Sequence, residues 1–589
     1  MKQLIFLLLA LLAASPAFAQ SNRDDLTPLQ IAYTTTVSED LKSFEIDVEV
    51  QNLQRPRLHV AMPNWMPGTY YIGQFGKRVQ DLSATGSDGS ALDVLQMDHQ
   101  TWSIDTQGHS TVKVSYRLPS ARRRGRSSES DQTVTGLRIG GTDTYLYVEG
   151  SKLVPVTATY KLPADWQVAN GLLTTEDPMV FHARDYDTFA DAPTILGLFE
   201  ERGFEVNGTP FRCVFFTNSQ EYDFDMDAFV SLVRRIVINQ GELFGSYPFP
   251  NYVFLFSLPG GGGLEHLNST SIGLRAESQR RDPEAGASVT SHEFFHTWNV
   301  KRIRPEVLGP FEYEHENYTG NLWVSEGWTS YFGDLTLVRT GILNEDEFLN
   351  LMARFISREQ SKVRRLEHSV FWASRNVWHR SASETEPRVD YYAKGEMLGA
   401  LIDLKIRHET NNAKSLNDVM RFFNRWFAEK NVGFAEGDVE RACTALSNYD
   451  FSEFFARHVY GTVDPPLAEY FAYAGIEYSE DITPCSFPFA LRGNRVSGRR
   501  AQIMVPSKEP VAGEIIIAVD GEEFTNAKSF LKTYQPGDIV TLTLDEDGVE
   551  RELDVTLIDK AIVTASLKVR EDATEKQNRI REAWLSSVE

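Results

Sequence analysis

The sequence predicts a multidomain fold with an all-β N-terminal domain, a mostly helical α+β middle domain and a small β-rich C-terminal domain. Alternating apolar residues fill the first third of the chain, helical spacing dominates the middle, and short strand patterns return near the end. With 589 residues, the chain has room for three or four domains at about 150 residues each. The predicted boundaries divide it into residues 1–19, 20–205, 206–483, 484–570 and 571–589.

The segment before residue 223 has strand patterns and no long amphipathic helix. Apolar residues alternate with polar ones at a period of two, which is typical of strands with one buried face. Gly, Pro and Asp turns separate these runs. The clearest strand candidates are Phe44–Val50, Val112–Tyr116, Tyr145–Val148 and Val154–Leu162.

The middle of the chain changes to helical spacing. Asp225–Gly241 has apolar residues three and four positions apart, which predicts a helix with one buried face. A strand over Tyr252–Leu258 runs into the glycine-rich turn Gly260–Gly263. Further helices are expected at about residues 286–300, 320–339, 345–360, 394–409, 415–429 and 450–459.

Short strands return after about residue 484. The sequence predicts a strand over Gly513–Asp520, a short helix over Ala527–Tyr534 and a strand over Ile539–Leu544. The end of the chain, from Glu571, is expected to form a charged helical tail.

The charge balance argues against a nucleic-acid partner. The chain has 59 Lys and Arg against 82 Asp and Glu, a net charge of −23, and such a surface repels phosphate backbones. The one basic cluster, Arg122–Arg126, has no aromatic residues among its arginines. We interpret it as a solvated loop.

The first 19 residues have the pattern of a secretory signal peptide. Lys2 precedes the apolar run Leu4–Ala14, and the small-x-small sequence Ala17–Ala19 predicts cleavage after Ala19. The apolar run is too short to span a bilayer, and no cysteine follows the cleavage site to carry a lipid. We therefore expect an exported protein, periplasmic or secreted, without a membrane anchor.

The three cysteines do not form a recognisable metal site. Cys213, Cys443 and Cys485 lack the paired CxxC spacing of thiolate zinc sites, so a metal would need histidine and carboxylate ligands. The sequence leaves open whether Cys443 and Cys485 form a disulfide.

The strongest chemical signal is the motif His292-Glu293-Phe294-Phe295-His296. Residues four positions apart share one face of a helix, so both imidazoles can bind one metal ion. Glu293 would then lie beside the water that the metal activates. The alternative is that two ordinary helical histidines satisfy this pattern by chance.

Zinc requires a third protein ligand, and Glu326 is the candidate. It lies in the apolar sequence Trp323–Tyr331, where a carboxylate without a partner would be costly to bury. The competing glutamates lie in a loop broken by Pro and Gly and are interpreted as solvated charges. They are Glu306, Glu312, Glu314 and Glu316.

These segments resemble known zinc aminopeptidases. The sequence around Glu326, WVSEGWTSY, resembles the WLNEG segment of M1-type aminopeptidases, and His292–Pro305, HEFFHTWNVKRIRP, is more similar to the glycyl aminopeptidase family. Trp65–Tyr70, WMPGTY, resembles that family's N-terminal WxPGxY motif. The resemblance implies a thermolysin-like catalytic domain between a β domain and a C-terminal PDZ domain. The spacer between His296 and Glu326 is longer than in other gluzincins, as it is in this family.

A glycine-rich segment resembles the substrate-binding GAMEN motif of M1-type enzymes. Gly262, Gly263 and Glu265 occupy the matching positions, and the resemblance implies that Glu265 binds the free α-amino group of the substrate. His266 stands in place of the usual Asn. A simple turn is the alternative interpretation.

Tyr392 lies in Tyr-Ala-Lys-Gly, which resembles the YxKG motif whose tyrosine stabilises the oxyanion. The adjacent Tyr391 is the competing candidate. Three residues of the histidine segment match the family string without an assigned chemical role and are interpreted as packing residues: Asn299, Arg302 and Arg304.

The C-terminal segment Gly513–Phe524, GEIIIAVDGEEF, resembles a PDZ strand and turn. Its carboxylate-binding loop would lie near Pro488–Leu491, without the usual glycines. Capture of a peptide or protein C-terminus and a purely structural role both remain open.

Together these features predict a zinc-dependent aminopeptidase with one zinc ion per chain. His292, His296 and Glu326 would bind zinc, Glu293 would act as general base, and Tyr392 would stabilise the oxyanion. The expected partners are peptides with a free N-terminus, and the family resemblance implies Gly or Ala as the first residue. The alternatives are a zinc endopeptidase or carboxypeptidase on the same fold, and an inactive PDZ-containing scaffold that binds peptides.

Overall fold

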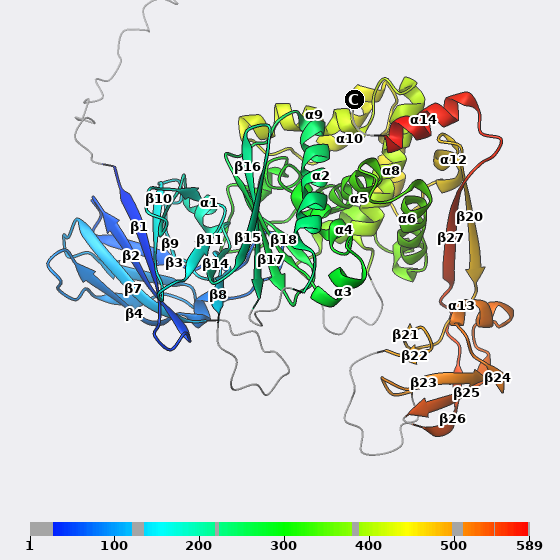
Figure 1. The fold of residues 1–589 in the computed structure, drawn as a ribbon, viewed down its shortest axis with the longest axis horizontal. Helices are drawn as coiled ribbons and strands as arrows, with labels where there is room; N and C mark the ends of the chain where they lie inside the picture. The colour runs from blue at the N-terminus through cyan, green and yellow to red at the C-terminus, as the bar shows by residue number, and fades with distance from the viewer. Residues whose placement is uncertain are drawn as a thin grey trace, which may run out of the picture.

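The computed structural model describes residues 28–120, 135–217, 223–379, 388–497, 510–546 and 548–586. A β-rich N-terminal domain, a helical central domain and a β-rich C-terminal region follow one another along the long axis (Figure 1). This confirms the predicted fold class at that level. The predicted signal peptide, residues 1–19, and the basic cluster Arg122–Arg126 lie outside the described residues.

Two sheets enclose the core of the N-terminal domain. Alternation turns every second side chain inward, such as Tyr33 and Val48 from the larger sheet and Val60 and Ile104 from the smaller one. In order across the larger sheet the strands are β12 (Leu173–Thr174), β13 (Val180–Ala183), β10 (Val156–Lys161), β1 (Gln30–Val37), β2 (Ser43–Gln51), β7 (Thr111–Pro119) and β4 (Gln80–Gly86). The smaller sheet has β5 (Val94–Gln96), β6 (Thr101–Asp105), β3 (Arg57–Ala61) and β9 (Tyr147–Val148).

A third, short sheet and the helix α1 (Tyr186–Ala190) lead toward the central domain. Its strands are β11 (Gln167–Ala169), β14 (Thr194–Gly197) and β8 (Gly136–Ile139). The next strand already belongs to the sheet of the central domain, so the predicted boundary at residue 205 falls within a strand.

The central domain contains a five-stranded sheet whose last strand forms an exposed edge. In order its strands are β15 (Glu200–Val206), β16 (Thr209–Thr217), β17 (Tyr252–Leu258), β19 (Ser269–Gly273) and β18 (Gly263–Glu265). Strand β17 is buried along its whole length, which explains its continuous apolar sequence. The edge strand β18 contacts helix α4 (Ala287–Phe295), and these two elements carry most of the residues singled out above.

The remaining mass of the central domain is helical, as the spacing predicts. Its longer helices are α2 (Met226–Phe244), α5 (Thr329–Arg339), α6 (Glu345–Gln360), α8 (Tyr391–Thr410), α9 (Leu416–Trp426) and α10 (Asp438–Ser447). Shorter segments are α3 (Ala276–Arg281), the π-helical η3 (Trp323–Trp328), α7 (Val370–Arg375), α11 (Ser452–Phe454) and α12 (Leu467–Ala472).

Local capping explains where these helices begin and end. Asp225 accepts a hydrogen bond from the Ala228 amide at the start of α2, and Gly245 with φ +79° ends that helix. Asn344 forms a capping box with Glu347, so α6 begins at the predicted residue.

The C-terminal region is joined to the central domain by a two-stranded ribbon. Strand β20 (Ile476–Thr483) pairs with β27 (Ile562–Val569), and the far end of this ribbon carries a small sheet (Figure 1). The sheet is built from β21 (Leu491–Arg492), β22 (Arg495–Val496), β23 (Ile515–Val519), β24 (Glu522–Glu523), β25 (Ile539–Glu546) and β26 (Val549–Thr556), with the short helix α13 (Ala527–Phe530) beside it.

The charged tail is helical and docks on the central domain. Helix α14 (Glu575–Leu585) buries Ile580 and Trp584 in the core of that domain, and the Trp584 indole donates to the hydroxyl of Tyr331 at 2.6 Å. The sequence pattern predicts the helix but not this docking.

The three cysteines form no disulfide. Cys213, Cys443 and Cys485 are buried and free, so Cys443 and Cys485 do not pair.

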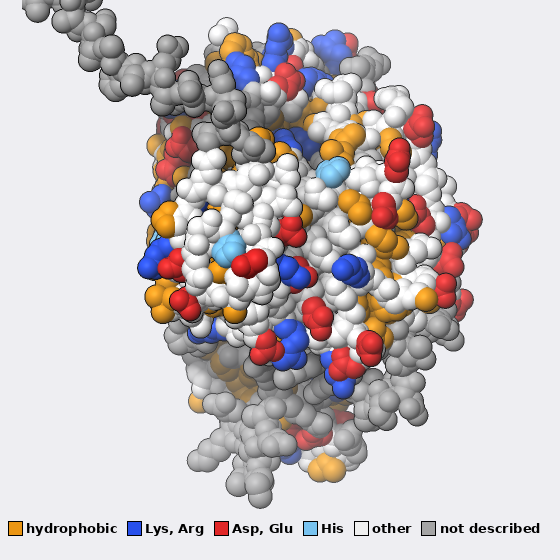
Figure 2. Space-filling view, turned by 90° about the vertical axis from the view of Figure 1, so that its left-hand side faces the viewer, with side chains coloured by type: hydrophobic (Ala, Val, Ile, Leu, Met, Phe, Trp, Pro, Cys, Tyr) orange, Lys and Arg blue, Asp and Glu red, His pale blue; other side chains and the backbone are white. Residues whose placement is uncertain are grey.

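Figure 2 shows the outer end of the N-terminal domain, where acidic and basic side chains are interspersed rather than gathered into a basic patch. None of the described helices is both long and apolar enough to cross a membrane.

Candidate active site

Helix α4 brings the two motif histidines together. It begins after Gly286, whose φ of +85° favours glycine, and carries His292 one turn before His296. The Nε2 atoms of the two imidazoles lie 2.9 Å apart. Two nitrogen donors therefore converge on one point.

Glu326 completes a three-ligand group. Its Oε2 atom lies 3.2 Å from His296 Nε2 and 3.6 Å from His292 Nε2. Glu326 belongs to the π-helical segment η3, a rare geometry that is frequent at functional sites. This segment crosses α8 closely, because a Cβ at Gly327 would overlap the backbone of Gly395.

Hydrogen bonds on the far side of each imidazole orient the Nε2 atoms. His296 Nδ1 donates to the carbonyl of Asn299 at 2.7 Å, and His292 Nδ1 lies 3.2 Å from the Ser330 hydroxyl. The Asn299 amide in turn donates to the carbonyl of Val324 at 2.8 Å. Asn299 therefore ties the histidine helix to the segment that carries Glu326, a role that the sequence did not indicate.

The electrostatics of the site favour a cation. Burial raises the pKa of Glu293 well above its usual value, and Glu265 and Glu326 add to this effect. Burial would also raise the pKa of Glu326, but the two histidines outweigh it and hold that pKa at about 2. Burial disfavours the charged form of His296, yet the surrounding carboxylates raise its pKa to about 10. The carboxyl groups of Glu265, Glu293 and Glu326 thus lie around the imidazoles, and the negative potential that raises the pKa of His296 suits a divalent ion.

The edge strand β18 lies directly against Glu293. A Cβ at Gly263 would overlap the Glu293 carboxylate, so only glycine allows this approach. Gly262 precedes it with φ +73° and open space around it, and its carbonyl accepts from the Gly273 amide at 2.9 Å. The two predicted substrate-binding glycines therefore have different roles in the structure, one in the close contact and one in the turn.

Glu265 is buried beside this group. The residue is only 4% exposed, and its Oε1 atom has no hydrogen-bond partner among the described residues. Ligand atoms of Glu265, Glu293 and His296 all lie within 4.8 Å of one another. From the N-terminal domain, Gly68 covers the carboxylate, since a Cβ there would lie 2.7 Å from Glu265 Oε1.

His266 points into the domain interface instead of the site. Its Nδ1 atom lies 3.1 Å from Asp191 Oδ1, and the same oxygen accepts from Lys301 Nζ at 2.9 Å. Asp191 Oδ2 accepts from the Leu267 amide at 2.7 Å. The residue that replaces the usual Asn therefore fixes β18 to the N-terminal domain.

Tyr392 lies at the start of α8, beside the metal ligands. Its amide donates to the Asp390 side chain at 3.0 Å, and its ring stacks on His292 with centroids 6.0 Å apart. Burial, then the charge of Glu326, raises the pKa of its hydroxyl. Tyr391 packs beside it and is more deeply buried, so the structure brings Tyr392 to His292 rather than the competing tyrosine.

The long spacer between His296 and Glu326 docks on the N-terminal domain. The carbonyl of Glu312 accepts from Trp65 Nε1 at 2.7 Å, and that of Glu314 accepts from the side-chain amide of Asn64 at 3.1 Å. No competing glutamate belongs to a three-ligand group among the described residues. Arg302 also has a packing role, because it donates to the carbonyl of Leu267 at 2.8 Å.

Tyr70 and Gly68 were not predicted to lie at the site. Both belong to the WMPGTY motif, whose residue types carry no metal or acid–base signal. The only indication was the WMPGTY motif itself, because the family resemblance placed it in the N-terminal domain but assigned it no role.

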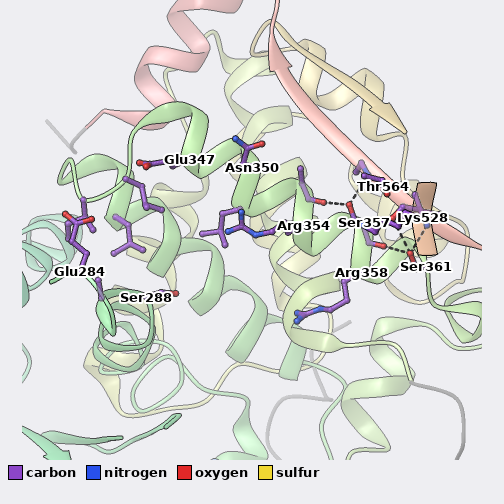
Figure 3. Close-up of a pocket in the computed structure, with 18 of the residues that line it drawn as sticks. Glu284, Ser288, Glu347, Asn350, Arg354, Ser357, Arg358, Ser361, Lys528 and Thr564 are labelled. Carbon is purple, nitrogen blue, oxygen red and sulfur yellow. Dashed lines mark hydrogen bonds between the residues drawn. The ribbon is translucent and has the colours of Figure 1, made fainter. Parts of the chain in front are cut away.

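A separate cavity of about 850 Å³ has none of the candidate active-site residues in its lining. It lies between α6 and β27, with Glu284 and Glu347 toward one end and Arg358 and Lys528 toward the other (Figure 3). At that end the Ser357 hydroxyl accepts from the Ala565 amide at 2.8 Å. This bond attaches the β20–β27 ribbon to α6.

Comparisons with known proteins agree with this geometry. The family profile described as M61 glycyl aminopeptidase matches residues 286–398, and the peptidase M61 N-terminal domain matches residues 33–198. A crystal structure of an aminopeptidase N family protein from Idiomarina loihiensis is 26% identical, with a TM-score of 0.79, and covers 95% of this chain and 100% of that chain. Among curated proteins, none matches the chain significantly.

Two further structures have lower scores. An M1 zinc metallopeptidase from Deinococcus radiodurans is 14% identical, with a TM-score of 0.45, covering 74% of this chain and 96% of that chain. Yeast LTA4 hydrolase in complex with bestatin is 13% identical, with a TM-score of 0.47, covering 74% and 68%. From the two M61 profiles and the His292, His296 and Glu326 group, the chain belongs to the M61 glycyl aminopeptidase family and is a zinc metallopeptidase.

Proposed function

We propose that this protein removes an N-terminal glycine or alanine from peptides, with one zinc ion per chain. The observation that supports this best is the buried carboxylate of Glu265. One of its oxygens has no hydrogen-bond partner among the described residues, and a ligand atom of Glu265 lies within 4.8 Å of one on the predicted metal ligand His296. Such a group stays buried at a cost unless a cation pairs with it, and the ammonium of a peptide is the cation that an aminopeptidase must recognise.

The residues present fit a zinc ion. Two imidazole Nε2 atoms and one carboxylate oxygen, each held by hydrogen bonds or packing, are the ligand set of catalytic zinc sites that keep one position open. When bound, zinc supplies a Lewis acid that polarises the peptide carbonyl and activates a water molecule.

Glu293 acts as the general base. Its buried carboxylate has an oxygen without a hydrogen-bond partner among the described residues, and burial raises its pKa, which makes the carboxylate a stronger proton acceptor. It takes a proton from the attacking water and gives it to the leaving amine. Its carboxylate lies against Gly263, where a Cβ would overlap it.

Tyr392 and Glu265 act on the two ends of the first residue. The Tyr392 hydroxyl, beside His292, donates to the developing oxyanion of the scissile carbonyl. Glu265 pairs with the free ammonium, so a blocked N-terminus leaves this carboxylate buried without a partner. Loss of such a pair slows blocked peptides by about tens to hundreds of times.

Hydrolysis of matched substrates tests the proposal. Gly- and Ala-anilides and their N-acetylated forms are compared before chelation, after chelation and after zinc is returned. We expect cleavage of the free-amine forms alone, lost on chelation and restored by zinc. Equal cleavage of blocked forms would support the endopeptidase alternative, and no cleavage by zinc-loaded protein would support the scaffold.

Two variants test whether the preference for free-amine substrates depends on Glu265. Glu265→Gln should lower kcat/KM for free-amine substrates by at least tenfold. Glu312→Gln, in the spacer whose carbonyl binds Trp65, is the matched control and should retain the preference.

We propose two further properties from the sequence. The strand β23 and the turn before β24 correspond to the GEIIIAVDGEEF segment, which supports a PDZ-like module that binds a peptide or protein C-terminus. Export through the signal peptide, to the periplasm or outside the cell, rests on residues 1–19. N-terminal sequencing of the exported protein tests the predicted cleavage after Ala19.

A further inference from the structure

Tyr70 comes from the N-terminal domain but packs in the core of the catalytic domain. It is 5% exposed and belongs to the hydrophobic cluster formed by the catalytic helices. Its ring meets Trp378 edge to face, with centroids 5.7 Å apart. In the opposite direction, Tyr313 from the spacer packs in the core of the N-terminal domain. Each domain therefore buries a tyrosine of the other in its own core.

The loop that carries Tyr70 is held in an uncommon backbone conformation. Tyr70 has φ +46° and Gly68 has φ +88°. A bulky residue with positive φ persists only where its surroundings fix it. Here Trp65 provides the fixation, through its bond to the Glu312 carbonyl and its edge-to-face contact with Trp378 at 5.1 Å. The ring of Tyr70 is consequently a rigid wall.

This wall lies beside the predicted ammonium-binding carboxylate. Tyr70 and Glu265 line the same small cavity, and Gly68 of the same loop covers the Glu265 carboxylate. Glu265 in turn has a ligand atom within 4.8 Å of one on the metal ligand His296. Its hydroxyl makes no hydrogen bond to another described residue. Tyr70, Glu265 and Gly68 are among the residues that line a cavity of only about 20 Å³, together with Lys301 and Phe311, and this is room for one water-sized group.

The chemistry of a peptide N-terminus places the first side chain at this wall. The ammonium and the scissile carbonyl of one residue are separated by its Cα alone. If Glu265 binds the ammonium and the metal ligands lie at the carbonyl, the Cα must lie in the short span between them, and Tyr70 stands beside the Glu265 end of that span. We propose that Tyr70 is the specificity-determining residue that limits the first residue of the substrate to glycine or alanine. This inference rests on the proposed aminopeptidase function.

Hydrogen or a methyl group fits beside the ring, whereas a larger side chain has to displace it. Trp378 and the fixed loop oppose that displacement. The specificity is therefore set by a residue outside the catalytic domain, and the long spacer contributes by holding the Trp65–Tyr70 loop in place.

Tyr70→Gly tests the inference, because glycine accepts the positive φ and removes the ring. With zinc-loaded full-length protein, kcat/KM is measured for Gly-, Ala- and Leu-anilides. We expect the Leu-to-Gly ratio of kcat/KM to rise at least tenfold in Tyr70→Gly. Tyr70→Phe keeps the wall and should keep the ratio within about threefold. The adjacent Tyr71 is 68% exposed, so Tyr71→Gly is the matched control and should leave the ratio unchanged.

The Leu-to-Gly ratio of kcat/KM separates an effect on specificity from an effect on stability, because partial unfolding lowers the rates with the Gly-, Ala- and Leu-anilides together. An unchanged ratio in folded, zinc-containing Tyr70→Gly would overturn the inference. Should that variant not fold, Tyr70→Asn, which also tolerates positive φ, is measured in the same way and is judged by the same ratio. If the wild-type protein cleaves no free-amine anilide, the proposed function fails instead.

Discussion

The α-carbon of Gly263 faces the carboxylate of Glu293 so closely that any side chain on Gly263 would overlap it. The edge strand of the sheet and the predicted general base are thus in direct contact. A substrate that lies along β18 would reach Glu293 without an intervening side chain. The position of Glu293 depends on this glycine as well as on helix α4.

Gly263→Ala should displace the Glu293 carboxylate. Because misplacing a catalytic group by about 1 Å can cost about a hundredfold, kcat should fall by tens to hundreds of times while zinc remains bound. Steady-state kinetics with a Gly-anilide and metal analysis check this. Gly261→Ala, where a Cβ meets nothing within 4 Å, should have near wild-type activity. Equal activity of the two variants would contradict the contact.

Asp191→Asn should destabilise the domain interface. Asp191 is buried, pairs with Lys301 at 2.9 Å, and also contacts His266 at 3.1 Å. Loss of the charge leaves Lys301 buried without its partner, which costs about 3–5 kcal/mol. Thermal unfolding measures the change. The exposed Arg117–Asp81 pair is the control, and Asp81→Asn should change stability by less than about 1 kcal/mol. Similar melting temperatures for both variants would show that the buried network is dispensable.

Trp584→Ala should release the C-terminal helix. The indole is fully buried and donates to the Tyr331 hydroxyl, which donates to Asp403 at 2.6 Å. Truncation of a buried Trp costs about 3–5 kcal/mol. Urea unfolding of the central domain and proteolysis of the last residues report the loss. Arg579→Ala, on the exposed face of the same helix, serves as the control. Wild-type stability of Trp584→Ala would mean that α14 packs without contributing.

A buried carboxyl pair predicts how stability depends on pH. Burial raises the pKa of Asp334 to about 7, and burial together with Asp334 raises that of Glu396; Arg354 and Arg358 partly oppose these shifts. The folded state therefore keeps protons that the unfolded chain releases above about pH 4. The contribution of this pair to stability is fully present below that pH and is lost as pH rises through about 7.

Glu396→Gln makes one partner permanently neutral, so the fall in melting temperature between pH 5 and pH 8 should be smaller than in the wild-type protein. The exposed Glu477→Gln is the control. Parallel pH profiles for the two variants would refute the role of the pair.

Much of the fold and the metal group could be predicted because their signals are local. The four-residue spacing of His292 and His296 fixes a shared helix face, and the capping box of Asn344 and Glu347 fixes the start of α6. Period-two alternation and continuous apolar runs distinguish the half-buried strands from the fully buried β17.

The remaining features depend on long-range contacts that a single sequence does not encode visibly. His266 bonds to Asp191 across 75 positions, and Trp584 bonds to Tyr331 across 253. Tyr70 reaches the site only because the spacer of the other domain docks on its loop. The π-helical turn around Glu326 has no distinctive composition, and the close crossing of Gly327 with Gly395 becomes apparent only when both helices are placed.

The most direct test of the account is Glu293→Gln in zinc-loaded protein. The substitution retains size and removes the proton acceptor, so we expect zinc content to stay at one per chain while kcat for a Gly-anilide falls by about 10²–10⁴. Glu284→Gln, an exposed glutamate before the same helix, should retain full activity. Unchanged peptidase activity in metal-loaded Glu293→Gln would contradict the assigned mechanism.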